Sequence, residues 1–171
     1  MKTQSSRSAF VLTLTALVFL GCLGASCSRN SDIDIALKDH GPEPTALNID
    51  AHTAANENFI TVFWTGKNLQ VTLMSIPAGG EIGLERHADT DQFLRVEEGQ
   101  AKVVMGDSKE SLTFVRTVKS DFAIMIPAGK WHNVINTGGK PLKLYSVYAP
   151  PEHPRGAAYK TRKEAEAAHQ H

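Results

Sequence analysis

The sequence predicts an all-β domain built as a sandwich or a barrel. Eight short runs rich in β-branched, aromatic and aliphatic residues follow one another between residues 58 and 150. Turn signals such as TGKN, PAGG, GDSKE and NTGGKP separate these runs at intervals of about eight to twelve residues, as in sandwiches and barrels. No helical periodicity interrupts them, so a parallel sheet with crossover helices is not expected.

The candidate strands can be named in chain order. They are FITVFWT, LQVTLMSI, QFLRVEE, AKVVMG, SLTFVRTV, DFAIMIP, WHNVINT and LKLYSVYAP. Because side chains alternate along a strand, Gln92 shares a face with Leu94 and Val96. Arg95 and Glu97 point the other way, as an exposed pair. An apolar face with a polar residue at one end is typical of a strand that contributes to a buried ligand set.

The segments on either side of this strand region have a different composition. Residues 27–57 are polar, with Gly-Pro and Pro-Thr punctuation, and are interpreted as a tether and an edge segment. Residues 151–171 are interpreted as a loop and a short C-terminal helix. Thr161 followed three residues later by Glu164 is a capping-box pattern, and an alanine-rich stretch comes after it. The loop PPEHPRG before this helix is assigned to the surface.

The N-terminus indicates export. Residues 1–26 contain Lys2 and Arg7, followed by an apolar run over about residues 9–23, and are interpreted as a signal peptide. The run is shorter than the roughly 20 residues that span a bilayer. A retained membrane anchor helix is the alternative interpretation.

Cys22 and Cys27 both lie at the end of the apolar run, and no cysteine follows them. Small residues before a cysteine resemble the lipobox of bacterial lipoproteins, in which the cysteine is acylated. Cys27 is the preferred lipidation site, because the polar SRNSD after it is suited to a tether. The protein is therefore expected at the cell envelope, anchored to a bacterial membrane by lipid. Cleavage and release of a soluble periplasmic protein is the alternative.

The charge balance points to no nucleic-acid partner. Removal of residues 1–26 takes two of the 18 Lys and Arg residues and none of the 18 Asp and Glu residues, which leaves 16 basic against 18 acidic residues. A formal charge of −2 gives no basic surface for a nucleic acid.

Two ordered series of residues stand out in the strand region. The first is Gly79, Glu85, His87, Gln92 and Gly99, and the second is Pro127, Gly129, His132 and Asn136. Their spacings and order resemble the two motifs of the cupin superfamily. The differences are Glu85 in place of a histidine, Gln92 in place of a glutamate, and Asp121 in place of the glycine that leads the second motif.

The resemblance implies a double-stranded β-helix, or cupin jelly-roll barrel, over residues 58–150. In that fold Glu85, His87, Gln92 and His132 converge inside the barrel and hold one divalent metal ion. Nitrogen and oxygen ligands without a thiolate suit zinc, manganese, iron or nickel. The chain is most similar to small cupins labelled mannose-6-phosphate isomerase-like, and such isomerases bind zinc with the same inventory of two His, one Glu and one Gln.

The spacing has its own physical meaning. Residues 85 and 87 lie on the same face if they belong to one strand, and all four side chains are competent ligands. The alternative is a barrel without metal, in which these side chains hydrogen-bond one another.

Two classes of function stay open. One is a metal-dependent oxygenase or isomerase that acts on a small polar molecule, with catalytic residues not identified. The other is a non-catalytic module that binds a small, sugar-like molecule at the cell envelope. The resemblance further implies a homodimer.

Overall fold

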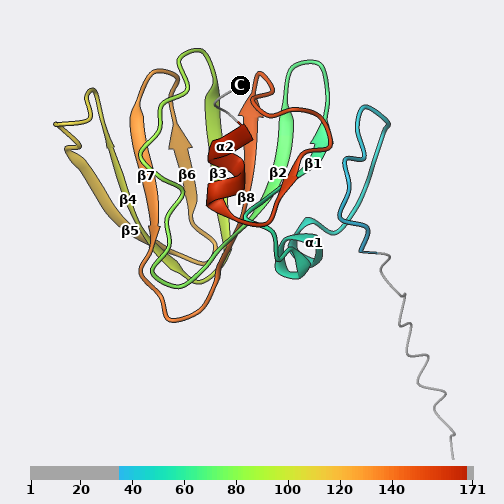
Figure 1. Ribbon diagram of the computed structural model, residues 1–171, viewed down its shortest axis with the longest axis horizontal. Helices are drawn as coiled ribbons and strands as arrows, with labels where there is room; N and C mark the ends of the chain where they lie inside the picture. The colour runs from blue at the N-terminus through green and yellow to red at the C-terminus, as the bar shows by residue number, and fades with distance from the viewer. Residues whose placement is uncertain (1–34, 169–171) are drawn as a thin grey trace, which may run out of the picture. The chain divides into compact units, whose positions relative to one another are not determined.

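The computed structural model describes residues 35–168, so the predicted signal peptide and the predicted lipidation site at Cys27 lie outside the described residues. In chain order the elements are α1 (Ile49–Ala55), β1 (Ile60–Thr65), β2 (Gln70–Ile76), β3 (Asp91–Glu98), β4 (Gln100–Gly106), β5 (Phe114–Lys119), β6 (Ala123–Ile126), β7 (Trp131–Asn136), β8 (Leu142–Ala149), β9 (Ala158–Tyr159) and α2 (Arg162–Ala168). The eight predicted strands are confirmed as β1 to β8 (Figure 1).

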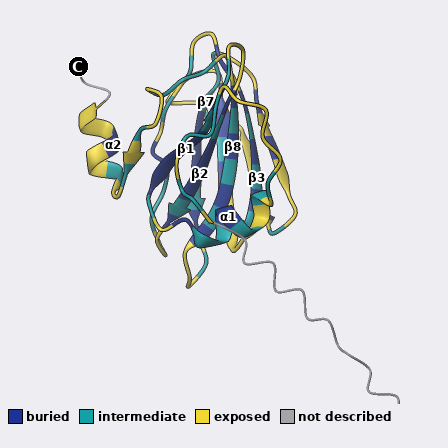
Figure 2. Cartoon of the chain, turned by 90° about the vertical axis from the view of Figure 1, so that its right-hand side faces the viewer, coloured by how far each residue is buried: buried dark blue, intermediate teal, exposed yellow. Residues whose placement is uncertain are grey.

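The strands form two antiparallel sheets. The larger sheet has the order β6-β3-β8-β2-β1-β9, and the smaller has the order β5-β4-β7. Both sheets contribute to one core, with Leu94 and Leu144 from the larger sheet and Val103 and Val134 from the smaller, each at most 1% exposed. Figure 2 shows that buried residues are concentrated in strands such as β2 and β8, whereas α2 is mostly exposed. The predicted double-stranded β-helix is confirmed.

A short helix, α1, lies in the segment that we interpreted as tether and edge. Asn48 caps it by accepting a hydrogen bond from the amide of Ala51 at 3.1 Å, and Asp50 lies in its first turn. His52 and Thr53 are buried on its inner side. The helix has seven residues, which is too short for an apolar period to show in the sequence.

The predicted C-terminal helix is confirmed as α2. Oγ1 of Thr161 accepts a hydrogen bond from the amide of Glu164 at 3.2 Å, as the capping pattern indicates. The carboxylate of Glu164 accepts from the amide of Lys160 at 2.8 Å. Within residues 35–168 no helix has the length and apolarity to cross a bilayer.

The turn between β5 and β6 has a backbone that usually needs glycine. Asp121 has a φ of 73°, in the left-handed region, at the position where the motif leads with glycine. Its carboxylate accepts a hydrogen bond from Arg95 at 2.7 Å, and Arg95 also pairs with Glu97. The side chain of Glu97 is only 5% exposed, so the prediction of an exposed pair is wrong for this residue, which Arg95 covers.

Candidate metal centre

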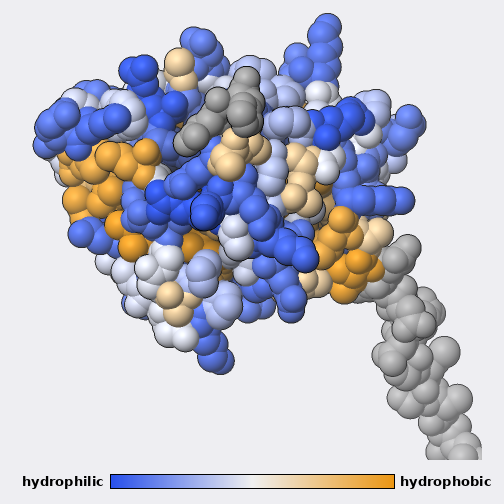
Figure 3. All heavy atoms as spheres, viewed as in Figure 1, coloured by the Kyte–Doolittle hydropathy of each residue, from blue (hydrophilic) through white to orange (hydrophobic). Residues whose placement is uncertain are grey.

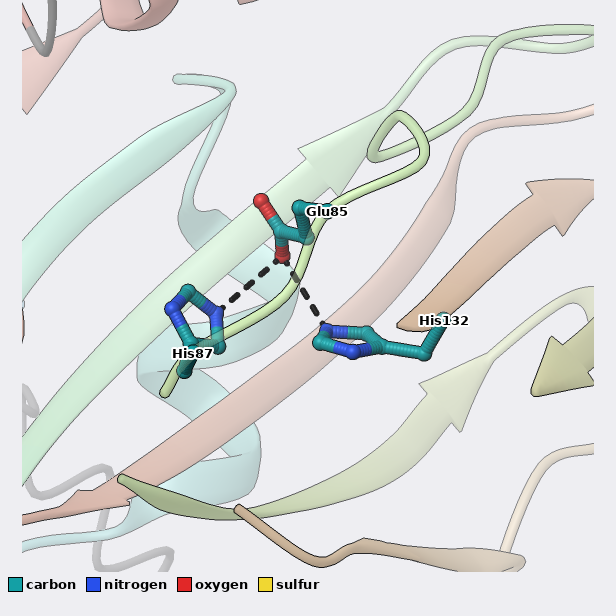
Figure 4. A group of neighbouring side chains, drawn as sticks. All are labelled: Glu85, His87 and His132. Atoms are coloured by element: carbon teal, nitrogen blue, oxygen red, sulfur yellow. Dashed lines mark ion pairs between the residues drawn. The ribbon is translucent and has the colours of Figure 1, made fainter. Parts of the chain in front are cut away.

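Glu85, His87 and His132 meet in one cluster (Figure 4). Oε1 of Glu85 lies 3.4 Å from Nε2 of His87 and 3.4 Å from Nε2 of His132. One potential ligand atom from each residue lies within 4.8 Å of the others. Three of the four predicted metal ligands are therefore brought together.

Backbone pairing places Glu85 beside His132. The amide of Glu85 donates to the carbonyl of His132 at 3.0 Å, and the amide of His132 donates back to the carbonyl of Glu85 at 3.0 Å. Glu85 and His87 would share a face if they belonged to one strand, but in the structure Glu85 forms an isolated bridge with His132 and lies outside the named strands. Gly83, with a φ of 112°, interrupts the extended backbone just before this bridge.

Each imidazole is oriented through its Nδ1 atom. Nδ1 of His132 lies 2.9 Å from the carbonyl oxygen of Lys130, and Nδ1 of His87 lies 3.0 Å from Oε1 of Glu152. The other oxygen of Glu152 accepts a hydrogen bond from the hydroxyl of Thr90 at 3.0 Å. A carbonyl and a carboxylate only accept, so each imidazole in its neutral form carries the proton on Nδ1 and presents a lone pair at Nε2.

Three lone pairs thus face one another: those of the two Nε2 atoms and of Oε1 of Glu85. Neither Nε2 atom has a hydrogen-bond partner among the described residues, and both are buried. The 3.4 Å separations are longer than ordinary hydrogen bonds. Neighbouring ligands on a divalent ion with bonds of about 2.1 Å lie about 3.0–3.5 Å apart. The cluster fits a bound cation.

The groups of the cluster shift one another's pKa toward the charged forms. Burial by itself raises the pKa of Glu85, but its interactions with the nearby imidazoles of His132 and His87 outweigh burial and lower that pKa to about 2. Burial lowers the pKa of His87, while Glu85 and Glu152 raise it, and the net direction is upward. Glu85 is therefore ionised at neutral pH and ready to bind a cation.

Gln92, the fourth predicted ligand, is buried at the start of β3 with an exposure of 3%. Its Nε2 donates to the hydroxyl of Ser146 at 3.1 Å, while its Oε1 is buried without a hydrogen-bond partner among the described residues. It pairs across the sheet with Tyr148, whose ring contacts the ring of His87 edge-on at 5.5 Å. Coordination by Gln92 stays a prediction, supported by this unpaired oxygen.

Sequence reasoning missed the loop after β8. Glu152 and His153, assigned to a surface loop, lie against the cluster, and the ring of His153 contacts Tyr148 at 5.0 Å. The buried side chain of Gln70 holds this loop, because it accepts from the amide of His153 at 2.9 Å and donates to its carbonyl at 2.9 Å. Only the position of Glu152 soon after an expected strand end hinted at this role.

A cavity of about 260 Å³ adjoins the cluster. The residues that line it are Phe59, Ile60, Met74, Ile82, Glu85, His87, Tyr148, His153, Arg162, Ala165 and Glu166. Tyr148 is 2% exposed, and burial, followed by the charge of Glu85, raises the pKa of its hydroxyl. Tyr148 is therefore protonated at neutral pH.

Comparison with known proteins agrees with the fold and the motifs. A family model described as "Cupin domain" matches residues 72–148. The uncharacterized protein YrkC of Bacillus subtilis is 55% identical over 141 residues, which cover 82% of this chain and 76% of YrkC.

Solved structures extend the comparison. The crystal structure of BH2720 from Bacillus halodurans is 55% identical, with a TM-score of 0.75, and the match covers 76% of this chain and 98% of BH2720. A Klebsiella pneumoniae protein with a double-stranded β-helix domain shares the fold at 21% identity, with a TM-score of 0.53 and coverage of 70% of this chain and all of that one. With both motifs on a double-stranded β-helix and a relative this similar over most of its length, the chain belongs to the cupin superfamily.

Proposed function

We propose that this cupin binds one divalent metal ion through Glu85, His87 and His132, with Gln92 as a fourth ligand. The observation that carries the proposal is the meeting of three lone-pair atoms whose Nδ1 partners leave no proton between them. Buried polar atoms are normally paired, so a shared cation accounts for all of them at once. Zinc, manganese, iron and nickel suit this ligand set.

The ion, when bound, would polarise a carbonyl or acidify a bound water. The protein's own residues supply the rest. Glu85, with a side-chain exposure of 35%, and His87 both line the cavity. Tyr148 and His153 place proton-bearing groups on the same wall. A protonated Tyr148 can donate a hydrogen bond to an oxygen that gains negative charge.

These proton-bearing groups favour a metal-dependent enzyme of oxygenase or isomerase type that acts on a small molecule. The second candidate is a non-catalytic module that binds a small molecule at the cell envelope. The apolar side chains of Phe59, Ile60 and Met74 on the cavity wall favour this candidate. Both candidates need the metal centre, so metal binding is the property to test first.

The test is metal analysis of the purified protein after refilling with zinc, manganese, iron or nickel in turn. We expect about one equivalent per chain with at least one of these ions, and less than a tenth of an equivalent in His87→Ala and His132→Ala. His40→Ala is the matched control, because His40 hydrogen-bonds Ala36, outside the cluster. A parent protein without stoichiometric metal after all four treatments would contradict the proposal.

Gln92 can be tested against an exposed glutamine outside the site. Gln92→Leu removes the unpaired oxygen and is expected to weaken zinc binding at least tenfold, since a ligand is lost. Gln100→Leu makes the same substitution at the start of β4, outside the cavity lining, and is expected to leave the zinc Kd unchanged. An unchanged zinc Kd in Gln92→Leu would remove Gln92 from the ligand set.

A further inference from the structure

The cavity beside the metal centre has a polar end and an apolar body. Glu85, His87, Tyr148 and His153 form the polar end, and the remaining wall is mostly apolar. The apolar lining residues are Phe59, Ile60, Met74, Ile82 and Ala165. Its volume of about 260 Å³ is below the roughly 300–1,000 Å³ of pockets for drug-sized ligands. A ligand must be small and must have an apolar part.

Helix α2 closes one side of this cavity and brings the one Lys or Arg side chain that lines it within residues 35–168, Arg162. The guanidinium is already engaged. Its Nη1 lies 2.6 Å from Oε1 of Glu81, and its Nε lies 2.6 Å from Oε1 of Glu166. A Cβ at Gly83 would come within 2.7 Å of its Nη2, so the third nitrogen packs against the backbone there.

The charges at this rim add up to a negative value. The rim consists of Arg162 and Glu166, which line the cavity, and of Glu81, which lies outside the lining and pairs with Arg162. The two carboxylates outweigh the single guanidinium and leave one net negative charge. At the polar end, Glu85 and Glu152 together balance the two charges of a divalent ion. The cavity therefore offers an anion no net attraction, and its rim repels one.

We infer that the cavity takes an uncharged small molecule with two oxygen donors at one end and an apolar remainder, such as a compact diketone or hydroxyketone. We infer further that it discriminates against phosphorylated and dicarboxylate compounds. This inference rests on the proposed metal centre, to which the donor oxygens bind. The apolar walls contact the apolar part of the ligand. The rim of Glu81, Arg162 and Glu166 repels anionic ligands.

The test compares two chelators of nearly the same shape, acetylacetone and malonate. Both place two oxygens on a three-carbon spacing. Malonate is a dianion, whereas acetylacetone is uncharged in solution, carries only the single charge of its enolate when it gives up a proton to the buffer on binding a metal, and ends in methyl groups. Calorimetric titration of the zinc-loaded protein is expected to show acetylacetone binding at least tenfold more tightly than malonate. Zinc retained after ultrafiltration shows that neither chelator has stripped the ion.

Two outcomes would overturn the inference while the metal centre stands: malonate binding as tightly as acetylacetone, or no binding of acetylacetone to protein that retains its zinc. Protein that never takes up zinc, manganese, iron or nickel would overturn the proposed function, and the inference with it. Metal analysis before the titration separates the two kinds of failure.

A variant of the rim tests the charge argument directly. Glu166→Gln removes one of the two carboxylates on Arg162, so the malonate Kd is expected to fall at least threefold while the acetylacetone Kd changes less than twofold. Glu110→Gln makes the same change of charge at an exposed residue outside the cavity lining and is expected to alter neither. An equal response of malonate in both variants would refute a role for the rim.

Discussion

Glu152 decides which nitrogen of His87 faces the metal centre. Its carboxylate lies 3.0 Å from Nδ1 of His87 and is itself held by the hydroxyl of Thr90. Carboxylates in this position fix the tautomer and ring orientation of a ligating histidine and raise its basicity. A carbonyl, that of Lys130, does the same for His132. The two imidazoles thus have supports of different strength, and only one of these supports can be changed by substitution.

Glu152→Gln is therefore expected to weaken zinc binding about 10- to 100-fold, because a neutral amide orients His87 less strongly and removes the charge behind it. The measurement is the zinc Kd by competition with a chromogenic chelator. Glu110→Gln, at an exposed residue that belongs neither to the cluster nor to the cavity lining, serves as the control for the change in net charge. A Kd within twofold of the parent would show that Glu152 does not support the site.

Most of the individual residues of the site could be predicted from the sequence. Glu85, His87 and His132 stand at motif spacings, and the structure brings them together. Glu152 could not be predicted, because its contact with His87 spans 65 positions of the chain and depends on how the loop after β8 folds back. Spacing patterns report local geometry, and a supporting contact between distant segments leaves no such pattern.

Asp39 anchors the chain before α1 to the barrel. Its carboxylate accepts hydrogen bonds from the amide and the hydroxyl of Thr65 at 3.0 and 2.7 Å, from the amide of Gly41 at 2.9 Å and from the amide of Gly156 at 3.2 Å. Burial raises the pKa of Asp39, but these hydrogen bonds and the charge of Arg155 outweigh it, so its pKa is lowered. The residues from Asp39 to α1 are therefore bound to the domain.

Asp39→Asn is expected to lower the free energy of unfolding at pH 7 by about 1 kcal/mol, because hydrogen bonds to a partly buried charge are weakened or lost. A lowered folded-state pKa gives stability that is present above the unfolded value of 3.8 and is lost as pH falls through the folded value. The difference between parent and variant should thus shrink below about pH 4.

Urea denaturation at pH 7 and pH 3 measures this difference. Asp107→Asn is the control, because Asp107 is 88% exposed and pairs with Lys130 at the surface, where such pairs contribute little. A difference that is the same at both pH values would contradict the role of the Asp39 charge.

The elements themselves were predictable to different degrees. Alternation of apolar residues and clear turn signals indicated all eight barrel strands, and a capping pattern indicated α2. Helix α1 was not predicted, although Asn48 and Asp50 are good capping residues, because seven residues are too few to show a period. The two-residue strand β9 is likewise too short to recognise from sequence.

At the scale of the whole molecule, the described residues form an apolar face at β5 and β6. Large apolar side chains of β5, β6 and the turn between them are exposed, from Phe114 at 42% to Met125 at 65%. Figure 3 shows an apolar area on the side of the molecule where β4 and β5 lie. Both β5 and β6 are sheet edges. The predicted homodimer, which stays a prediction, would find apolar contacts and unpaired strand edges there.

Localisation is a property of the whole chain and stays a prediction, because residues 1–34 lie outside the described part. If Cys27 is acylated, Cys27→Ser should move most of the protein from the membrane fraction to the soluble fraction, since one lipid-modified residue provides the anchor. Immunoblotting of the two fractions from cells that express the full chain measures the shift. Cys22→Ser is the matched control and should leave the protein at the membrane. If only Cys22→Ser releases the protein, Cys22 is the acylated residue. If neither substitution releases it, a retained anchor helix is favoured.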